Sequence, residues 1–329
     1  MKRITNKPRL WTVGLGAGLV GATLLALRYA LRAGGGRRLP EDTGPSEFTS
    51  RIFHSSFGEV LYHDGGHGTP ILFVHGVGVG ASSFEWSQVY GGFGTDYRVF
   101  APDLIGFGES RRPARRMTAD DHARVLAEFV QAVAGGGPVI LVGRGLGAAF
   151  CLRMAGQHPD LVKRVFAVMP GNLSGPDRER QPFGLRLASR VRGLNRFLYR
   201  NYFAGRAVIR RWLEEDGFAD PRGVTDEMVE NHFAYARQTG AEHAIFGFLR
   251  GDLDADLDAA VAQLEVPLHV VWIRNAQSVS IAEGERLRDL ARFGTLDVLE
   301  RVGLLPALEA PEAVSKLIRE ILEGPRLVE

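Results

Sequence analysis

The chain has a single cysteine among its 329 residues, Cys151. One cysteine excludes an intrachain disulfide and a metal site built from several thiolates. Excess charge is also lacking, because 40 basic residues nearly balance 38 acidic ones. So small a net charge argues against a nucleic-acid-binding protein. What is present is a globular composition, 45% apolar and 24% charged, with enough chain for one large α/β domain or two small ones.

Charge is missing from one long stretch near the N-terminus. Residues 11–27 form a run of 17 residues without a charged side chain, which would span roughly 26 Å as a helix. Continued past Arg28 to Leu31, the run spans about 32 Å, enough to cross a bilayer if Arg28 snorkels. A cleaved signal peptide is the alternative, but no clean small-x-small site follows. We expect a basic segment and transmembrane anchor over residues 1–32 and a Gly/Pro-rich linker over 33–47.

Small residues recur within this apolar segment. Gly14 and Gly18 form a G-x-x-x-G pattern, which lets membrane helices pack closely, although chance in a Gly/Ala-rich stretch explains it equally well. Basic residues flank both ends of the segment, so the charge bias does not fix its orientation. We therefore expect a single-pass membrane protein whose partners are the membrane and other membrane-protein subunits, with the side of the soluble domain left open.

From about residue 48 onward, short apolar runs alternate with helical patterns. Strands are expected at 51–56, 60–63, 71–74, 98–102, 139–142, 165–169, 266–272 and 295–301, and helices at 119–133, 148–157, 282–292 and 311–322. This rhythm predicts a doubly wound, mostly parallel α/β sheet. No strand pattern occurs between 171 and 250, so this region is expected to be a helical cap inserted between two parts of the core, 48–170 and 251–329.

The expected central strand runs directly into a glycine-rich turn, Gly143-Arg144-Gly145-Leu146-Gly147. A strand, a sharp turn and a helix form the nucleophile elbow G-x-S-x-G, whose middle residue is an attacking serine. Here the middle residue is Gly145, which has no side chain. Glycine adopts positive φ freely, whereas another residue in such a turn is strained by roughly 1–3 kcal/mol. The same glycines fit a dinucleotide fingerprint, but the next strand does not end in the acid that this motif requires. We expect no cofactor.

Four further motifs follow one another in a fixed order. They are FVHG at 73–76, DLIGFGES at 103–110, HPDLV at 158–162 and EAPEAV at 309–314. Together with the turn they resemble the α/β-hydrolase superfamily, in particular its cap-bearing branch of haloalkane dehalogenases, epoxide hydrolases and C–C bond hydrolases. The resemblance covers about residues 50–323. It implies oxyanion-hole donors at the backbone amides of Val77 and Leu146.

The same resemblance assigns positions for a catalytic triad. The nucleophile position is Gly145, the acid position is Ala276 and the histidine position is Leu304. None of these side chains can attack, accept a proton or orient a base. We therefore predict a catalytically inactive, membrane-anchored α/β-hydrolase-like protein that acts as an accessory or scaffolding subunit of a membrane complex or as a ligand-binding module. The alternative is an unconventional α/β-fold hydrolase of a small or lipid-like ester, epoxide or halide.

Several side chains outside the triad positions are candidates for an alternative catalytic group or a metal ligand. Each of them also has a simpler structural interpretation. Cys151 is expected to face the core, and His75 to be structural. The remaining candidates are Asn172 or Asp177 as an alternative acid, Ser278 and Ser280 as loop hydroxyls, and His54, His63 and His67 with Asp64 as a metal cluster. The histidines lack a ligand spacing typical of metal sites, so we expect no metal.

The expected cap is basic. Between residues 178 and 211 there are ten arginines against one acid, Glu179. Five of them recur at four-residue spacing, namely Arg186, Arg190, Arg192, Arg196 and Arg200, so each series lies along one helix face. Anionic lipid or an acidic protein face would offset their repulsion, and a solvated face is the alternative. The interleaved aromatic residues Phe197, Tyr199, Tyr202 and Phe203 are expected to pack the cap on the sheet.

Overall fold

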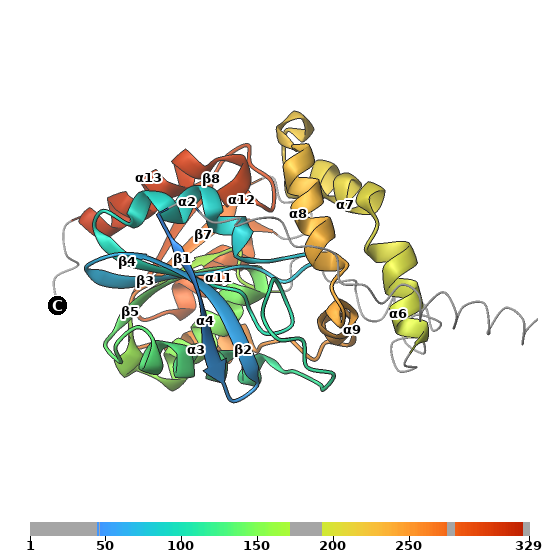
Figure 1. Cartoon of the computed structure of the whole chain (residues 1–329). Helices are drawn as coiled ribbons and strands as arrows, with labels where there is room; N and C mark the ends of the chain where they lie inside the picture. Colours follow the sequence, from blue (N-terminus) through green and yellow to red (C-terminus); the bar gives the residue numbers. More distant parts are fainter. Residues whose placement is uncertain (1–44, 46, 172–192, 275–279, 325–329) are drawn as a thin grey trace, which may run out of the picture.

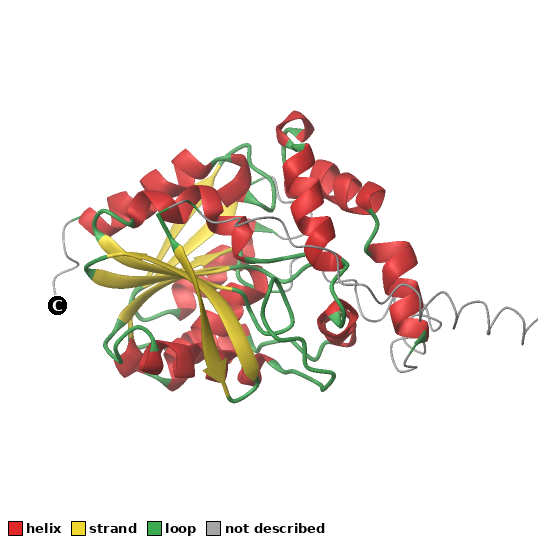
Figure 2. Cartoon of the chain, in the orientation of Figure 1, coloured by secondary structure: helices red, strands yellow, loops and turns green. Residues whose placement is uncertain are grey.

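A mixed eight-stranded sheet forms the centre of the protein (Figures 1 and 2). The computed structural model describes residues 45, 47–171, 193–274 and 280–324. The strands are β1 (Thr49–Ser55), β2 (Gly58–Gly66), β3 (Thr69–Val74), β4 (Tyr97–Pro102), β5 (Val139–Arg144), β6 (Val162–Val168), β7 (Leu268–Ile273) and β8 (Gly294–Leu299). Their order is β1-β2-β4-β3-β5-β6-β7-β8. The β1–β2 and β2–β4 pairs are antiparallel and the other five are parallel, which confirms the predicted mostly parallel α/β sheet.

Helices and short helical turns connect and cover the strands. The α-helices are α2 (Ser87–Tyr90), α3 (Ala119–Ala132), α4 (Gly145–Gln157), α6 (Leu194–Leu198), α7 (Arg206–Trp212), α8 (Asp226–Ala236), α9 (Ala241–Arg250), α10 (Leu257–Ala262), α11 (Ile281–Leu290), α12 (Pro306–Glu309) and α13 (Pro311–Glu323). Shorter turns are η1 (Ser83–Trp86), η2 (Gly91–Phe93), η3 (Pro159–Leu161), η5 (Tyr199–Phe203), η6 (Leu213–Gly217) and η7 (Pro221–Gly223), of which η5 and η6 are π-helical.

The sheet lies between two helical layers. Helices α3, α4, α10 and α11 pack on one face, and α2, α12 and α13 on the other (Figure 1). The central strand β5 is buried along its whole length, and its side chains alternate between the two layers. Val139 and Leu141 join one apolar core, whereas Ile140 and Val142 join the other. A strand covered on both faces has to be apolar at every position, which explains the uninterrupted run in the sequence.

The predicted helix after β5 begins earlier than expected. The sequence pattern predicts this helix over residues 148–157, whereas α4 begins at Gly145. Arg144 is still extended, with φ −123° and ψ 143°, and Gly145 alone makes the turn with φ +55°. One residue in the left-handed region reverses the chain at once, so the glycine-rich segment is already the first turn of the helix.

The segment inserted between β6 and β7 contains the helices α6 to α9, which lie to one side of the sheet (Figure 1). Their predicted packing is partly wrong. Tyr199 is buried, but Phe197 and Tyr202 are 42% and 64% exposed. On this helical stretch only one side faces the core, and Tyr199 and Phe203, four residues apart, occupy it. The aromatic residues therefore do not form a single packed set.

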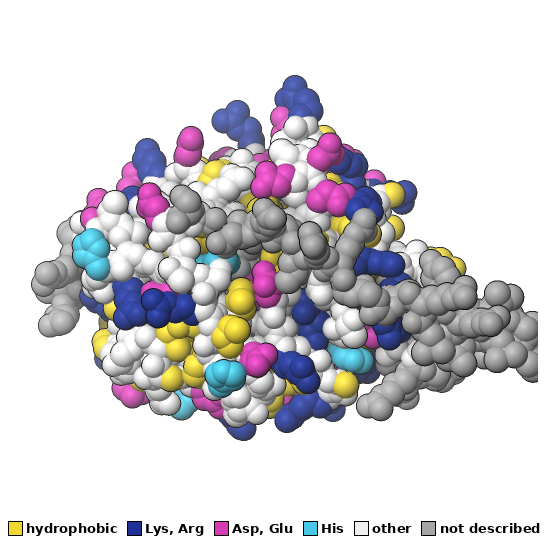
Figure 3. Space-filling model, in the orientation of Figure 1, with side chains coloured by type: hydrophobic (Ala, Val, Ile, Leu, Met, Phe, Trp, Pro, Cys, Tyr) yellow, Lys and Arg dark blue, Asp and Glu magenta, His cyan; other side chains and the backbone are white. Residues whose placement is uncertain are grey.

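The arginines of the cap region pair with acids from another helix. Arg206 forms an ion pair with Glu230, and Arg210 pairs with Asp226. Figure 3 shows basic and acidic side chains interspersed over the upper part of the molecule. The stretch that looked uniformly basic along the chain is thus partly neutralised in space by α8. Arg196 and Arg200 are half-buried, while Arg186, Arg190 and Arg192 lie outside the described residues.

The predicted N-terminal anchor, including Gly14 and Gly18, also lies outside the described residues. Among the helices of the described part of the chain, none is long and apolar enough to cross a membrane.

Candidate active site

The turn between β5 and α4 has the backbone of a nucleophile elbow. Its flanking glycines are required by close packing: a Cβ at Gly143 would lie 2.7 Å from the Ala148 Cα, and one at Gly147 would lie 2.1 Å from the His75 carbonyl oxygen. Gly145 differs from both. Among the described residues, a Cβ there would meet no atom closer than the Gly171 carbonyl oxygen at 3.8 Å. The position that carries a nucleophile in such turns therefore has room for a Cβ within the described part of the chain, but no side chain is present.

The loop that carries Leu304 is docked on the cap segment. The Leu304 amide donates to the Asp216 carbonyl (3.1 Å), and the Leu305 amide donates to the Gly217 carbonyl (2.9 Å). Leu304 is buried, so this loop brings an isobutyl group rather than an imidazole into the core. Ala276, the predicted acid position, lies outside the described residues.

Glu309 holds this arrangement together. Its carboxylate accepts hydrogen bonds from the amides of Ala219 (2.8 Å), Asp220 (2.9 Å) and Gly303 (2.5 Å). The first two amides belong to the cap segment and the third to the Leu304 loop. The glutamate of the EAPEAV motif therefore fixes the cap against the core.

Backbone donors remain available at the elbow. The amides of Leu146 and Val77, the predicted oxyanion-hole donors, make no hydrogen bond within the described part of the chain. Leu146 lies in the first turn of α4, where helix amides have no intrahelical acceptor and the helix dipole is positive. A developing negative charge at this point would find donors already in place.

His75 is structural, as its motif suggested. Its Nε2 accepts from the Leu104 amide (2.9 Å), and its Nδ1 donates to the Gly76 carbonyl (2.6 Å). Complete burial lowers the pKa of His75, which keeps the ring neutral in these two bonds. Both nitrogens are thus occupied in joining the loop after β3 to the loop after β4.

The DLIGFGES motif also serves to connect loops. The buried Asp103 carboxylate accepts from the amides of Ser83 and Glu109, each at 2.7 Å. The Ser110 hydroxyl donates to the Asp103 carbonyl (2.7 Å) and accepts from the Leu61 amide (2.9 Å). These bonds hold the two loops that border the elbow, and leave neither side chain free to act on a substrate.

A buried ion pair lies directly beside the elbow. Arg144, the residue before Gly145, donates through Nε and Nη2 to the two carboxylate oxygens of Glu85. The Gly76 amide also donates to Glu85 Oε2 (3.1 Å). The side chains of Glu85 and Arg144 are only 4% and 11% exposed. The elbow is therefore flanked by a fixed, compensated pair of charges.

A small cavity next to this ion pair is lined by the imidazole of one histidine. Gly78, Glu85, Arg144, Trp212 and His232 are among the residues that line it, and its volume of about 10 Å³ is close to that of one water-sized probe. His232 comes from α8 in the cap. Its Nδ1 lies 2.8 Å from the Met228 carbonyl, which fixes Nδ1 as the donor and Nε2 as the acceptor. Burial lowers the pKa of His232, so the ring is neutral near pH 7.

A sequence profile of the alpha/beta hydrolase family matches residues 71–317. The chain belongs to this family. It is 24% identical to the 2-hydroxy-6-oxo-6-(2'-aminophenyl)hexa-2,4-dienoic acid hydrolase of Metapseudomonas resinovorans over 81% of this chain and 88% of that protein. It is 26% identical to the 2-hydroxymuconate semialdehyde hydrolase of Pseudomonas sp. (strain CF600) over 79% of this chain and 89% of that protein. Among solved structures, a serine hydrolase involved in carbazole degradation aligns with a TM-score of 0.70 and 22% identity, over 84% of this chain and all of that one.

These comparisons correct the predicted function. The sequence suggested an inactive scaffolding subunit on a membrane anchor, because all three triad positions of this α/β-hydrolase are apolar. The relatives that align over most of its length are named as hydrolases, and none of the comparisons indicates a scaffold. The prediction of an inactive protein rested on the three triad positions, which report on one mechanism and not on residues outside the motifs.

The other candidates from the sequence do not form a second site. Cys151 is completely buried, and burial raises the pKa of its thiol. The Ser280 hydroxyl accepts from the Ala282 amide and so caps α11. Within the described residues, no group of histidines, cysteines and acids could hold a metal. Asn172, Asp177 and Ser278 lie outside the described residues.

Glu85 and His232 are the site residues that sequence reasoning missed. Ser82 and Glu85 have the spacing of a capping box, in which the glutamate would bond to the backbone of Ser82. Ser82 does cap η1 by accepting from the Phe84 amide, but Glu85 turns to Arg144 instead. His232 lies in a region without recognisable motifs. Only the tertiary contact of the cap with the loop after β3 reveals it.

Proposed function

We propose that this protein is a hydrolase of small or lipid-like carboxylic esters in which water, rather than a protein side chain, attacks the carbonyl carbon. The observation that carries this proposal is the neutral imidazole of His232. It lines the same water-sized cavity as Arg144, the residue immediately before Gly145, and its acceptor nitrogen is not used by the Met228 carbonyl.

The chain supplies the groups that such an attack requires. A water oxygen forms a bond to the carbonyl carbon while His232 Nε2 takes the water proton as general base. The amides of Val77 and Leu146 stabilise the tetrahedral oxyanion. The bond between the carbonyl carbon and the alcohol oxygen then breaks, and the departing alcohol oxygen accepts the proton from the His232 imidazolium. Because Gly145 has no side chain, no acyl-enzyme forms and the water has space beside the turn.

We propose further that residues 11–31 hold the protein at a membrane and that Gly14 and Gly18 face a partner helix there. The uncharged run is long enough for a span, and an anchor would place the catalytic domain near lipid-like substrates. Anionic lipid at the arginine-rich part of the cap is the matching partner. Fractionation of the full chain tests this step separately: recovery in the soluble fraction without detergent would contradict it.

The hydrolysis test uses the full chain in mild detergent with p-nitrophenyl acetate, butyrate and octanoate. Replacing a general base typically costs a factor of about 100 or more in kcat, so His232→Gln should lose at least that much. His54→Gln, an exposed histidine of the β1–β2 hairpin, should retain the wild-type rate. A fluorophosphonate probe should leave the wild-type protein unlabelled, and stopped-flow traces should lack a burst of p-nitrophenol.

Three results would overturn the proposal. The first is an absence of hydrolysis by the wild-type chain with all three esters. The second is a rate that His232→Gln leaves intact, which would require a different base. The third is a rate that the covalent probe abolishes, which would require a side-chain nucleophile.

A further inference from the structure

A tyrosine of the cap has a buried hydroxyl without a partner. Tyr199, in η5, is 1% exposed, and its phenolic oxygen makes no hydrogen bond in the described part of the chain. Leaving a buried polar atom unpaired costs about 1–3 kcal/mol. Burial also raises the pKa of this phenol, so the hydroxyl keeps its proton and can donate. Tyr199 plays no part in the hydrolytic steps described above.

A second unpaired donor comes from the loop after β4. Arg112 donates through Nη2 to the Gly108 carbonyl and through Nη1 to the Ser110 carbonyl (3.3 Å), but its buried Nε has no partner among the residues that the structure describes. A guanidinium offers only donors. The two backbone bonds fix the side chain in the loop, and the buried Nε–H is left for an acceptor from outside the protein.

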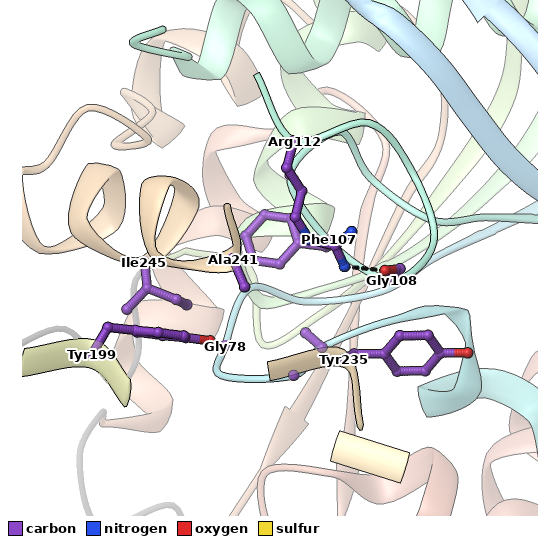
Figure 4. A pocket seen from close by; sticks show the side chains of 11 residues that line it. Gly78, Phe107, Gly108, Arg112, Tyr199, Tyr235, Ala241 and Ile245 are labelled. Atoms are coloured by element: carbon purple, nitrogen blue, oxygen red, sulfur yellow. Dashed lines mark hydrogen bonds between the residues drawn. The ribbon is translucent and has the colours of Figure 1, made fainter. Parts of the chain in front are cut away.

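These two residues line one cavity beneath the cap (Figure 4). Figure 4 shows the Tyr199 ring lying beside Ile245 with its hydroxyl directed toward Gly78. The cavity has a volume of about 10 Å³, which is room for one oxygen atom of a ligand or for one water. It adjoins the loop that contains Val77, the proposed oxyanion donor.

Arg112 also lines a second, larger opening. This cleft has a volume of about 810 Å³, and its charged lining residues are Arg111, Arg112, Arg196, Glu59, Glu109 and Glu242. Like Arg112, Arg196 has a buried Nε that finds no partner among the described residues. Arg112 is thus shared by the lining of a water-sized cavity and that of a cleft large enough for a small molecule.

Charged groups of both signs surround the two donors. On the Tyr199 hydroxyl the Glu242 carboxylate acts most strongly, followed by the guanidinium groups of Arg112, Arg237 and Arg200. The carboxylates of Asp103 and Glu109 act in turn on Arg112. The choice of ligand therefore depends on the two unpaired donors rather than on the net charge around them. A ligand that pairs with hydroxyl and guanidinium donors has to be an acceptor, and a planar carboxylate suits a guanidinium best.

We propose that Arg112 and Tyr199 bind a carboxylate of the substrate, remote from the bond that is cleaved. One carboxylate oxygen occupies the cavity between Tyr199 and Arg112, and the other faces the cleft beside Arg196. The ligand is a substrate only on the basis of the proposed function. Together, the two proposals narrow the substrates to half-esters of dicarboxylic acids. The site itself is a binding site whether or not turnover occurs.

Calorimetric titration of the full chain with hexanoate and with hexanol tests the site without turnover. Hexanoate should bind the wild type at least tenfold more tightly than hexanol. Loss of one hydrogen bond to a charged group is worth about 1.5–3 kcal/mol, so Tyr199→Phe should bind hexanoate at least about tenfold more weakly. Tyr202→Phe, an exposed tyrosine of the same helical turn, should match the wild type. Arg112→Lys should also weaken binding, because lysine keeps the charge but loses the forked donors.

Three outcomes would overturn the inference: equal affinities for hexanoate and hexanol, no hexanoate binding by the wild type, or unchanged binding by Tyr199→Phe. Greater thermal stability of Tyr199→Phe with unchanged binding would show that the cavity merely holds water. His232→Gln separates the two proposals, since it should still bind hexanoate. Failure of the hydrolysis test with hexanoate binding as expected would contradict the proposed mechanism and leave the carboxylate site intact. Failure of the binding test with hydrolysis as expected would contradict the carboxylate site alone.

Discussion

The guanidinium of Arg144 and the carboxylate of Glu85 meet in a two-pronged ion pair beside the elbow, 59 residues apart in sequence. Arg144 ends the central strand β5, whereas Glu85 lies in η1 after the β3 loop. A Cβ at Gly76 would lie 2.3 Å from Arg144 Nη2, so the guanidinium packs against bare backbone. The pair therefore links the elbow to the segment that presents the Val77 amide.

Removing one charge of this pair should strongly destabilise the protein. Breaking a buried ion pair leaves an uncompensated charge and costs about 3–5 kcal/mol. We expect Glu85→Gln and Arg144→Met each to show such a loss in urea denaturation. Replacing both residues together, as Glu85→Leu with Arg144→Met, should cost less than either single change, because no unpaired charge remains. Single variants as stable as the wild type would show that the pair is solvated.

The glycines of the elbow should respond very differently to the same substitution. At Gly145 a new side chain has space, so Gly145→Ala should cost only the strain of positive φ, about 1–2 kcal/mol. At Gly147 the Cβ would lie 2.1 Å from the His75 carbonyl, and Gly147→Ala should destabilise the fold considerably more. Thermal unfolding of the two variants measures the difference. Equal losses would contradict the open space seen at Gly145.

A serine at the elbow should not by itself create a conventional hydrolase. Gly145→Ser places a hydroxyl at the middle position of the elbow, where the G-x-S-x-G motif has its serine, but Leu304 offers it no base. We expect no labelling of this variant by a fluorophosphonate and lower ester hydrolysis than in the wild type, because the hydroxyl takes the space of the attacking water. Labelling or a gain in rate would mean that another group already acts as base beside Gly145.

The fold was predictable because the family motifs are largely structural. Asp103, His75 and Glu309 form hydrogen bonds that hold the loops around the elbow, so their spacing in the sequence reports the architecture. Strands such as β5 were found from apolar runs, since burial on both faces leaves no other composition. The positive φ of Gly145 followed from the turn type.

The candidate site was not predictable to the same extent. Glu85, His232 and Tyr199 come from segments with no motif. His232 and Tyr199 reach the core loops through the docking of the cap, and Glu85 reaches the elbow through the tertiary contact of η1 with the end of β5. Helical periodicity could not distinguish Tyr199, which faces the cavity, from Tyr202, which faces solvent. The three apolar triad positions led to the wrong prediction of an inactive scaffold. They exclude the usual serine mechanism but do not show which other side chains line the site.

Acid should destabilise the protein through its buried histidines. His122 is completely buried and stacked on Phe150 with ring centroids 4.6 Å apart, and burial lowers its pKa to about 4. The unfolded chain, with a histidine pKa of about 6.5, binds a proton that the native state excludes. Stability is therefore fully present above about pH 6.5 and falls as the pH drops toward 4.

Replacing this histidine should flatten the pH dependence. His122→Phe preserves stacking on Phe150 and removes the ionisable ring. Between pH 6.5 and 4 the slope of the unfolding free energy against pH should fall by up to about 1.4 kcal/mol per unit. The remaining slope includes His269, whose pKa burial also lowers to about 4. Urea denaturation across this range measures the slope for the wild type and for His122→Phe. The two slopes should coincide above pH 7.5. An unchanged slope in the variant would show that His122 titrates normally in the folded protein.

The thiol of Cys151 should report on opening of the core around α4. It is fully buried, and burial raises its pKa, so the reactive thiolate is scarce in the native state. Native protein should react with a disulfide reagent only as fast as it opens, whereas protein in urea should react at once. Because each 1.4 kcal/mol changes an opening equilibrium tenfold, Glu85→Gln should accelerate the native reaction about a hundredfold or more. Reaction of the wild-type thiol at the denatured rate would contradict its burial, and an unchanged rate in Glu85→Gln would show that the ion pair and α4 open independently.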